Sequence, residues 1–106
     1  MMYLSANEIN KRILNGESIN IIDIREPYEV ELASIGCREI PMSEIENHLE
    51  ELCATPNLVL MCRSGKRAES VANWLESEHG IEQIIVMEGG ICKWKDQVNP
   101  ALILED

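Results

Sequence analysis

The sequence predicts an α/β protein in which a mostly parallel sheet carries helices on both faces. Three short stretches of apolar and β-branched residues, 18–24, 58–62 and 84–87, are typical of buried strands. Stretches of helical spacing alternate with them along the chain. Because a parallel strand needs a crossover that packs back on the sheet, this alternation indicates three layers, with the sheet in the middle.

Local signals place the ends of the predicted helices. Ser5 and Glu8 form one capping-box pattern, and Ser43 and Glu46 form a second. A glycine or a Gly-Gly pair adjoins three of the helical stretches. The predicted helices cover residues 6–15, a short segment from about 26, 43–52, 66–79 and 89–94, and residues 38–41 form a short extended piece.

Length and charge limit the classes of function. The 106 residues suit one domain, residues 1–106, in which 99–106 form a C-terminal tail. The net charge of -10 repels nucleic acid and anionic membranes, and no apolar stretch has the length of a membrane span. We therefore expect neither a nucleic-acid nor a membrane partner.

Four cysteines are widely and irregularly spaced. No C-x-x-C pair occurs, which disfavours a zinc site, and the cysteines are too few for a disulfide scaffold. The N-terminal residues lack the basic and apolar regions of a signal peptide. These features predict a cytoplasmic protein with free thiols.

Parallel α/β sheets place their chemistry at the carboxyl ends of the strands. That rule points to residues 23–25, 62–67 and 88–90. The middle segment, Cys-Arg-Ser-Gly-Lys-Arg, is the most informative, because it joins a predicted buried strand to a helix and holds three of the nine Lys and Arg residues.

The segment 62–67 predicts an activated cysteine at position 62. Backbone N–H groups of such a loop, the N-terminus of the following helix and three nearby cations all favour a thiolate over a thiol. A thiolate is the attacking species in nucleophilic catalysis. The same groups would stabilise a persulfide, Cys62–S–S⁻, which also carries negative charge.

Four segments, in order, resemble the rhodanese family. The loop 62–67 resembles the family's six-residue active-site loop. Residues 22–29 resemble its Asp-x-Arg-x-x-x-Glu element, Gly36 with 40–41 its Gly-Ala-x-x-Ile-Pro stretch, and 88–94 its Gly-Gly-x-x-x-Trp signature. The resemblance covers residues 3–98. It departs from the family at Leu32-Ala33-Ser34, where Gly-His-Ile is usual, and at Cys37, where Ala is usual.

The resemblance implies a five-stranded sheet and a ping-pong transfer of sulfur. Cys62 would take the outer sulfur of a small anionic donor such as thiosulfate and pass it to a thiol, cyanide or a partner protein. The donor-binding residues implied are Arg63, Ser64, Gly65, Lys66 and Arg67. No metal or organic cofactor is implied, and a protein could serve as donor or acceptor.

Three alternatives stay open. Cysteine-dependent phosphatases and arsenate reductases use a Cys-x5-Arg loop, whereas Cys62 and Arg67 are spaced as Cys-x4-Arg, which makes a smaller cradle. A regulatory rhodanese module would act through a protein partner, although such modules generally lack the cysteine. A persulfide carrier would serve one protein and turn over thiosulfate poorly.

Three residues near the predicted site have structural interpretations. Helical spacing predicts an ion pair between Arg25 and Glu29. Cys37 is expected to be a buried small residue rather than a resolving thiol. Cys92 follows the Gly-Gly pair, which leaves a second thiol near the site as a lesser hypothesis.

Overall fold

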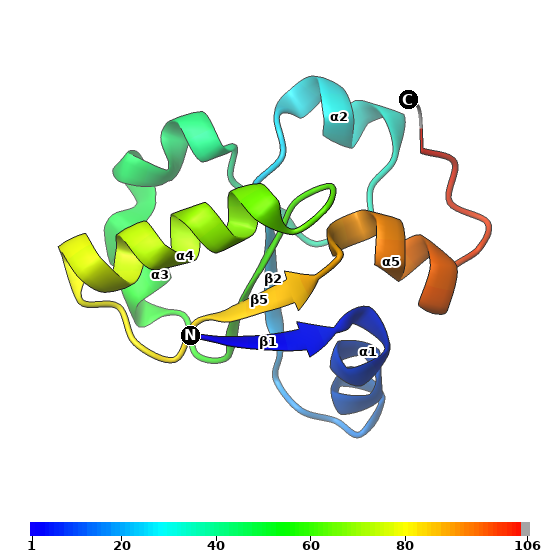
Figure 1. Cartoon of the computed structure of the whole chain (residues 1–106), viewed down its shortest axis with the longest axis horizontal. Coiled ribbons are helices and arrows are strands. Elements are labelled where there is room, and N and C mark those ends of the chain that lie inside the picture. The colour runs from blue at the N-terminus through cyan, green and yellow to red at the C-terminus, as the bar shows by residue number, and fades with distance from the viewer. Residues whose placement is uncertain (105–106) are drawn as a thin grey trace.

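The computed structural model describes residues 1–104 and contains one sheet of five parallel strands (Figure 1). The strands lie in the order β1-β5-β4-β2-β3. This arrangement confirms the predicted five-stranded sheet. The strand bounds are β1 Met2–Ser5, β2 Asn20–Asp23, β3 Arg38–Glu39, β4 Leu58–Met61 and β5 Ile85–Glu88.

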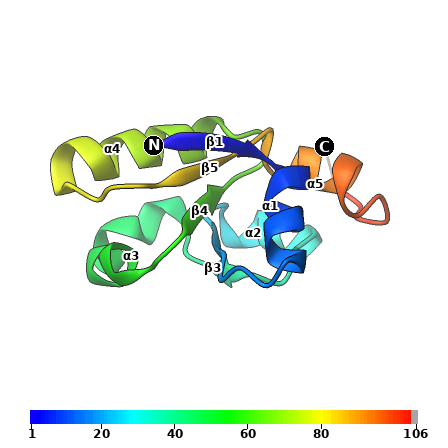
Figure 2. The same ribbon diagram turned by 90° about the horizontal axis from the view of Figure 1, so that it is seen from below.

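Helices occupy most of the connections between the strands. Figures 1 and 2 show α3 and α4 together at one end of the molecule and α1 and α5 together at the other. The helix bounds are α1 Ala6–Leu14, α2 Pro27–Leu32, the 3-10 helix η1 Met42–His48, α3 Leu49–Ala54, α4 Lys66–His79 and α5 Gly90–Gln97. Helix α2 follows the carboxyl end of β2.

Two apolar cores flank the sheet, because successive residues of a strand point to opposite faces. In β4, Leu58 and Leu60 pack with residues of α3 and α4, whereas Val59 and Met61 pack with residues of α1 and α5. All four side chains are buried. This double burial explains why the sequence of β4 is a continuous apolar run. Cys62 follows directly after the last residue of β4.

The structure confirms one predicted capping box and contradicts the other. The Glu8 N–H donates to the Ser5 hydroxyl at 3.1 Å, and the Ser5 N–H donates to the Glu8 carboxylate at 3.0 Å. The box predicted at Ser43 is wrong. Pro41 precedes a 3-10 helix there, and the Ser43 hydroxyl instead donates to the Glu26 carboxylate at 3.2 Å.

The C-terminal tail packs on the protein over the residues that are described. Leu102 and Leu104 pack against the core under α1 and α5, and the Lys95 ammonium donates to the Leu102 carbonyl oxygen. Residues 105–106 of the predicted tail lie outside the described residues. Among the helices of residues 1–104, none combines the length and the apolar character needed to cross a membrane.

Candidate active site

The loop 62–67 leads from β4 into α4, as its sequence predicts, and its last two residues, Lys66 and Arg67, form the start of α4. Cys62 is completely buried and follows the last residue of β4. Gly65 immediately precedes α4 with a φ of 100°, a left-handed value that glycine adopts without a steric penalty. The chain can therefore turn back on itself within the loop and bring the start of α4 over the cysteine.

Two backbone N–H groups donate to the Cys62 sulfur. The Gly65 N–H lies 3.0 Å from Sγ and the Ala68 N–H lies 3.4 Å from it. Gly65 is the residue directly before α4 and Ala68 lies in its first turn, where N–H groups have no partner within the helix and carry partial positive charge. Ala68 lies one residue beyond the segment in which the sequence predicted such donors.

The Gly89–Gly90 turn supports the loop from the side of β5. The Ile91 N–H donates to the Cys62 carbonyl oxygen at 2.8 Å. Gly90 has a φ of 57°, and a Cβ there would overlap the carbonyl oxygens of Cys62 and Arg63. Only glycine permits the turn to approach the backbone of Cys62 and Arg63 this closely. The turn therefore fixes the position of the Cys62 backbone.

Glu29 of α2 holds Arg67 of the loop through two hydrogen bonds. Nη1 lies 2.7 Å from Oε1, and Nη2 lies 2.8 Å from Oε2. The Arg67 guanidinium holds the pKa of the Glu29 carboxyl below its usual range. In turn the Glu29 carboxylate raises the pKa of Arg67, with a smaller contribution from Cys62. Arg67 is thus a permanent cation braced next to the loop.

Arg25 pairs with Asp23 and not, as predicted, with the Glu29 carboxylate. Its Nε lies 3.0 Å from one Asp23 oxygen, and its Nη2 lies 2.8 Å from the other. Both side chains are buried. The remaining Arg25 donors reach the carbonyl oxygens of Glu29 and Ala33, at 3.4 and 2.7 Å. Arg25 therefore fixes α2 against the end of β2.

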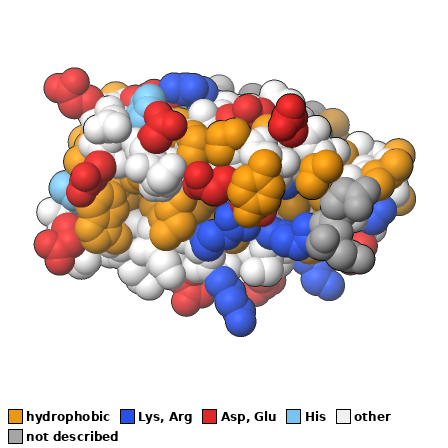
Figure 3. All heavy atoms as spheres, turned by 90° about the horizontal axis from the view of Figure 1, so that it is seen from above, with side chains coloured by type: hydrophobic (Ala, Val, Ile, Leu, Met, Phe, Trp, Pro, Cys, Tyr) orange, Lys and Arg blue, Asp and Glu red, His pale blue; other side chains and the backbone are white. Residues whose placement is uncertain are grey.

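The other loop residues face outward to different degrees. Ser64 and Lys66 are exposed and Arg63 is partly buried. Figure 3 shows Lys and Arg side chains gathered near the middle of the face seen from above, with acidic side chains around them. This cationic group stands out because Asp and Glu number 19 in the sequence against nine Lys and Arg.

The other cysteines lie in different surroundings, and all four thiols are free. Cys37 is partly buried, and burial, together with the nearby Asp23 charge, raises its pKa to about 12. This value favours the packing interpretation of Cys37, because a resolving thiol must ionise. The Cys92 N–H donates to the Arg63 carbonyl oxygen at 3.2 Å. No group of three potential metal ligands occurs in the described part of the chain.

The fold and the loop define an α/β protein with a buried cysteine between a parallel strand and the N-terminus of a helix. Residues 5–97 match the family model described as the rhodanese-like domain. The chain belongs to the rhodanese-like domain family.

Several relatives and solved structures resemble the chain. YtwF of Bacillus subtilis, provisionally named a sulfurtransferase, is 32% identical over 92% of this chain and 93% of its own length. YrkF of the same organism, provisionally named a sulfur carrier protein, is 32% identical over 86% of this chain, which spans only 49% of YrkF. A rhodanese-related protein of Thermoplasma volcanium is 27% identical, with a TM-score of 0.79 over 99% of this chain and all of its own.

Proposed function

We propose that the protein is a sulfurtransferase that carries sulfur as a persulfide on Cys62. The observation that supports the proposal most strongly is the pair of N–H groups, from Gly65 and Ala68, that converge on Sγ. The same donors suit the negative charge of a persulfide. Relatives provisionally named for sulfur transfer and sulfur carriage point in the same direction.

The transfer proceeds in two balanced steps. The Cys62 thiolate attacks the outer sulfur of thiosulfate, the S–S bond of the donor breaks, and sulfite leaves with the bonding electron pair. An acceptor such as cyanide then attacks the outer sulfur of Cys62–S–S⁻ and leaves as thiocyanate, which restores the thiolate. Lys66 and Arg63 attract the anionic donor, and Arg67 adds positive charge while Glu29 holds it in place.

Sulfur fits this loop better than phosphate does. Cys62 is completely buried, so the reacting atom of a substrate has to protrude from the rest of the molecule to reach Sγ. The terminal sulfur of a sulfane donor protrudes in this way, whereas a tetrahedral phosphate is wide at its reacting centre. We accordingly expect no Cys62-dependent hydrolysis of an aryl phosphate.

A protein partner is the second candidate role. YrkF carries a matching segment within a longer chain provisionally named a sulfur carrier, which supports transfer to or from another protein. In that case thiosulfate turnover is slow, and transfer from a protein persulfide is fast.

Free thiols also suit a reducing compartment such as the cytoplasm, which we propose as the location.

Thiocyanate formation from thiosulfate and cyanide tests the proposal. The wild type is compared with Cys62→Ser and with Cys53→Ser, whose cysteine is exposed on α3. The proposal is supported if the wild type and Cys53→Ser each produce sulfite and thiocyanate in equal amounts and Cys62→Ser produces neither. Equal activity of Cys62→Ser and the wild type would overturn it.

A further inference from the structure

A groove of about 250 Å³ lies between η1 and α4, outside the candidate active site. The buried residues Ile45 and Val71 form its floor. Met42, which is 41% exposed, and the partly buried Trp74 stand at its sides. The other lining residues are Ser43, Glu46 and Ser70. The volume is below the usual range for sites of small organic molecules, about 300–1,000 Å³, and suits a side chain of a protein partner.

The apolar side chains of the η1–α4 groove are of the kinds found at protein interfaces. Tryptophan and methionine are enriched there, and a methionine adapts its shape to what it contacts. Ser70, Val71 and Trp74 are spaced so that they share one face of α4. The His79 ring contacts the Trp74 ring edge-on, with the ring centroids 4.5 Å apart. The indole is therefore held in position before anything binds, which lowers the entropy cost of binding.

The wall of the groove that η1 provides is acidic. Residues 42–54, which make up η1 and α3, contain four glutamates and no Lys or Arg. Glu46 lines the groove, and the Ser43 hydroxyl donates to the Glu26 carboxylate at the same edge. Among residues 1–104, no Lys or Arg lines the groove. A second copy of this protein, with its net charge of -10, would be repelled, whereas a basic segment would be attracted.

The η1–α4 groove adjoins the candidate active-site loop. Ser70 is one helical turn along α4 from Lys66. On the other wall, Ser43 bonds to Glu26, the residue directly before α2. Figure 3 shows apolar side chains next to the Lys and Arg group on this face. A protein seated in the groove would thus have its neighbouring residues near the loop that carries Cys62.

We propose that this groove docks a basic segment of a protein partner. The segment inserts one apolar side chain between Met42 and Trp74 and places a Lys or Arg against Glu46. The proposal rests on the protein-partner role described under the proposed function, and it names the surface and the chemistry of that partner.

A partner docked in the groove can offer a cysteine to the loop. Its thiolate attacks the outer sulfur of Cys62–S–S⁻, and the S–S bond breaks. Cys62 leaves as the thiolate with the bonding electron pair, and the partner keeps the persulfide.

A short peptide with one leucine among lysines and arginines is the probe. In a titration of the ¹⁵N-labelled wild type followed by NMR, the Trp74 indole N–H signal should shift and saturate. The signal of Trp94, which packs on the other side of the sheet, should stay unchanged. Replacing the leucine with serine should weaken binding about tenfold, since one apolar contact in a pocket is worth about that factor. A peptide with glutamates in place of the basic residues should not bind.

Matched variants locate the peptide in the groove. Met42→Ser should weaken binding of the leucine peptide about threefold or more, whereas Leu14→Ser, which changes an exposed leucine on α1, should not. Glu46→Lys should weaken binding on the order of threefold at low salt and less at high salt, because ions screen an exposed charge. Glu17→Lys makes the same change of charge outside the groove and should bind the peptide as the wild type does.

A cysteine added to the peptide tests the transfer of sulfur. At low peptide concentration, sulfur should pass from Cys62–S–S⁻ to the leucine peptide about tenfold faster than to the serine peptide. Met42→Ser should lose at least about two thirds of that advantage, in line with its weaker binding.

Each failure has its own signature. Absence of a saturable shift at Trp74, or equal binding of the leucine and serine peptides, would overturn the docking surface even while thiosulfate formed a persulfide. So would unchanged binding in both Met42→Ser and Glu46→Lys. A Trp74 signal that shifts with protein concentration alone would show a second copy as the occupant and would also overturn the proposal. Binding of the leucine peptide with no persulfide from any donor would overturn the proposed function and support the docking surface.

Discussion

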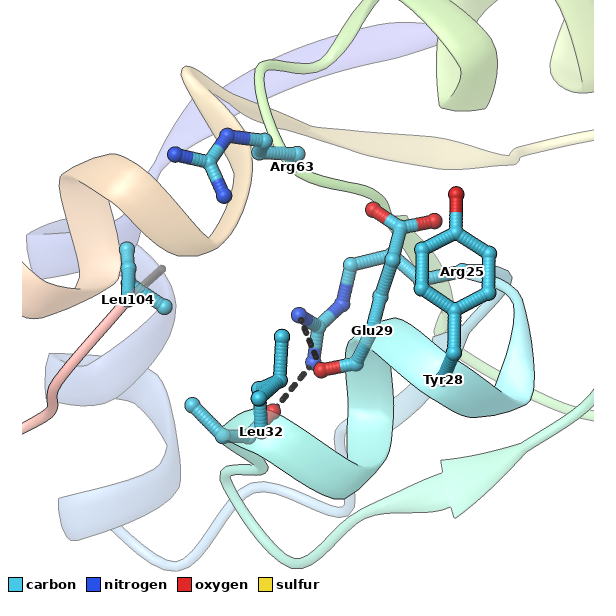
Figure 4. A pocket seen from close by; sticks show the side chains of 7 residues that line it. Arg25, Tyr28, Glu29, Leu32, Arg63 and Leu104 are labelled. Atoms are coloured by element: carbon cyan, nitrogen blue, oxygen red, sulfur yellow. Dashed lines mark hydrogen bonds between the residues drawn. The ribbon is translucent and has the colours of Figure 1, made fainter. Parts of the chain in front are cut away.

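Glu29 and Arg67 are 38 positions apart in the sequence, yet their side chains meet in a two-point ion pair at 2.7 and 2.8 Å. The pair ties α2 to the candidate active-site loop. Both α2 and the loop contribute to the wall of a cavity of about 580 Å³ (Figure 4). The ion pair also sets the position of a cation close to Cys62.

The substitution Glu29→Gln should weaken both the fold and the transfer of sulfur. We expect the free energy of unfolding at pH 7 to fall by about 1 kcal/mol, because solvent screens a pair whose arginine is partly exposed. Thiocyanate formation should fall on the order of tenfold as the loop loses its brace. Urea denaturation and the turnover assay measure the two effects, and Glu31→Gln, on the exposed part of α2, is the control.

The pH dependence of the same variant follows from the lowered pKa of Glu29. In the unfolded chain a glutamate has a pKa of about 4.3. Because the folded pKa lies lower, the ion pair stabilises the protein fully above that value, and this contribution is lost as the pH falls through the folded pKa. The difference in stability between the wild type and Glu29→Gln should thus be constant near neutrality and shrink below about pH 4. A constant difference down to pH 3 would contradict this account.

Asp23 and Arg25 form a fully buried pair, so removing either partner should be severe. Asp23→Asn leaves the Arg25 charge buried without its counter-charge, and we expect a loss of about 3–5 kcal/mol in the free energy of unfolding. Arg25→Met should cost a similar amount. The double variant should lose less than the sum of the two, which a double-mutant cycle by chemical denaturation can measure. Strict additivity would show that the two residues act independently.

The Gly89–Gly90 turn should tolerate no side chain at its second position. In Gly90→Ala the new methyl group would overlap two carbonyl oxygens of the loop, so both stability and sulfur transfer should fall sharply. Gly16→Ala is the matched control, because Gly16 also has a positive φ but no atom lies within 4 Å of the site of a Cβ. Its loss should be about 1 kcal/mol with activity unchanged. Equal effects of the two substitutions on activity would argue against the support that the turn gives the loop.

Cys37 should be almost inert to alkylation at moderately alkaline pH. Its pKa of about 12 means that the thiol is protonated at pH 8.5, whereas the exposed Cys53 should react with iodoacetamide readily. Because the folded pKa lies above the unfolded one, this thiol stabilises the fold below the unfolded pKa, and the contribution is lost as the pH rises towards 12. Peptide mapping by mass spectrometry gives the order of labelling. Labelling of Cys37 as fast as that of Cys53 in the folded protein would contradict the assignment.

The sequence predicts the elements whose signals are local. Helix α4 lies at 66–79 as predicted, because a glycine bounds it at each end and its apolar residues have helical spacing. The loop 62–67 is likewise placed correctly. Strand β1 was not predicted, because its four residues show no clear alternation and their partner, β5, lies some eighty residues away in the sequence.

The ion pairs near the loop could not be derived from spacing. The predicted pair of Arg25 with Glu29 relied on neighbours along a helix, but Arg25 precedes α2 and its guanidinium turns back to Asp23. Glu29 is then available to Arg67, which the sequence places in another element. The Ser43 capping box is also wrong, because the Ser43 hydroxyl donates a hydrogen bond to the carboxylate of Glu26, the residue before α2. The first error arose because Arg25 lies outside the helix and bonds to a residue two positions before it, and the second because Ser43 bonds to a residue of another segment.

The most direct test of the central claim is the mass of the intact protein after incubation with thiosulfate. The account predicts that the wild type gains one sulfur atom, that a reductant removes it, and that peptide mapping locates it on Cys62. Cys62→Ser should show no gain, and Cys92→Ser should behave as the wild type. A wild type that gains no sulfur from thiosulfate, an organic thiosulfonate or a protein persulfide, or a gain that persists in Cys62→Ser, would contradict the account.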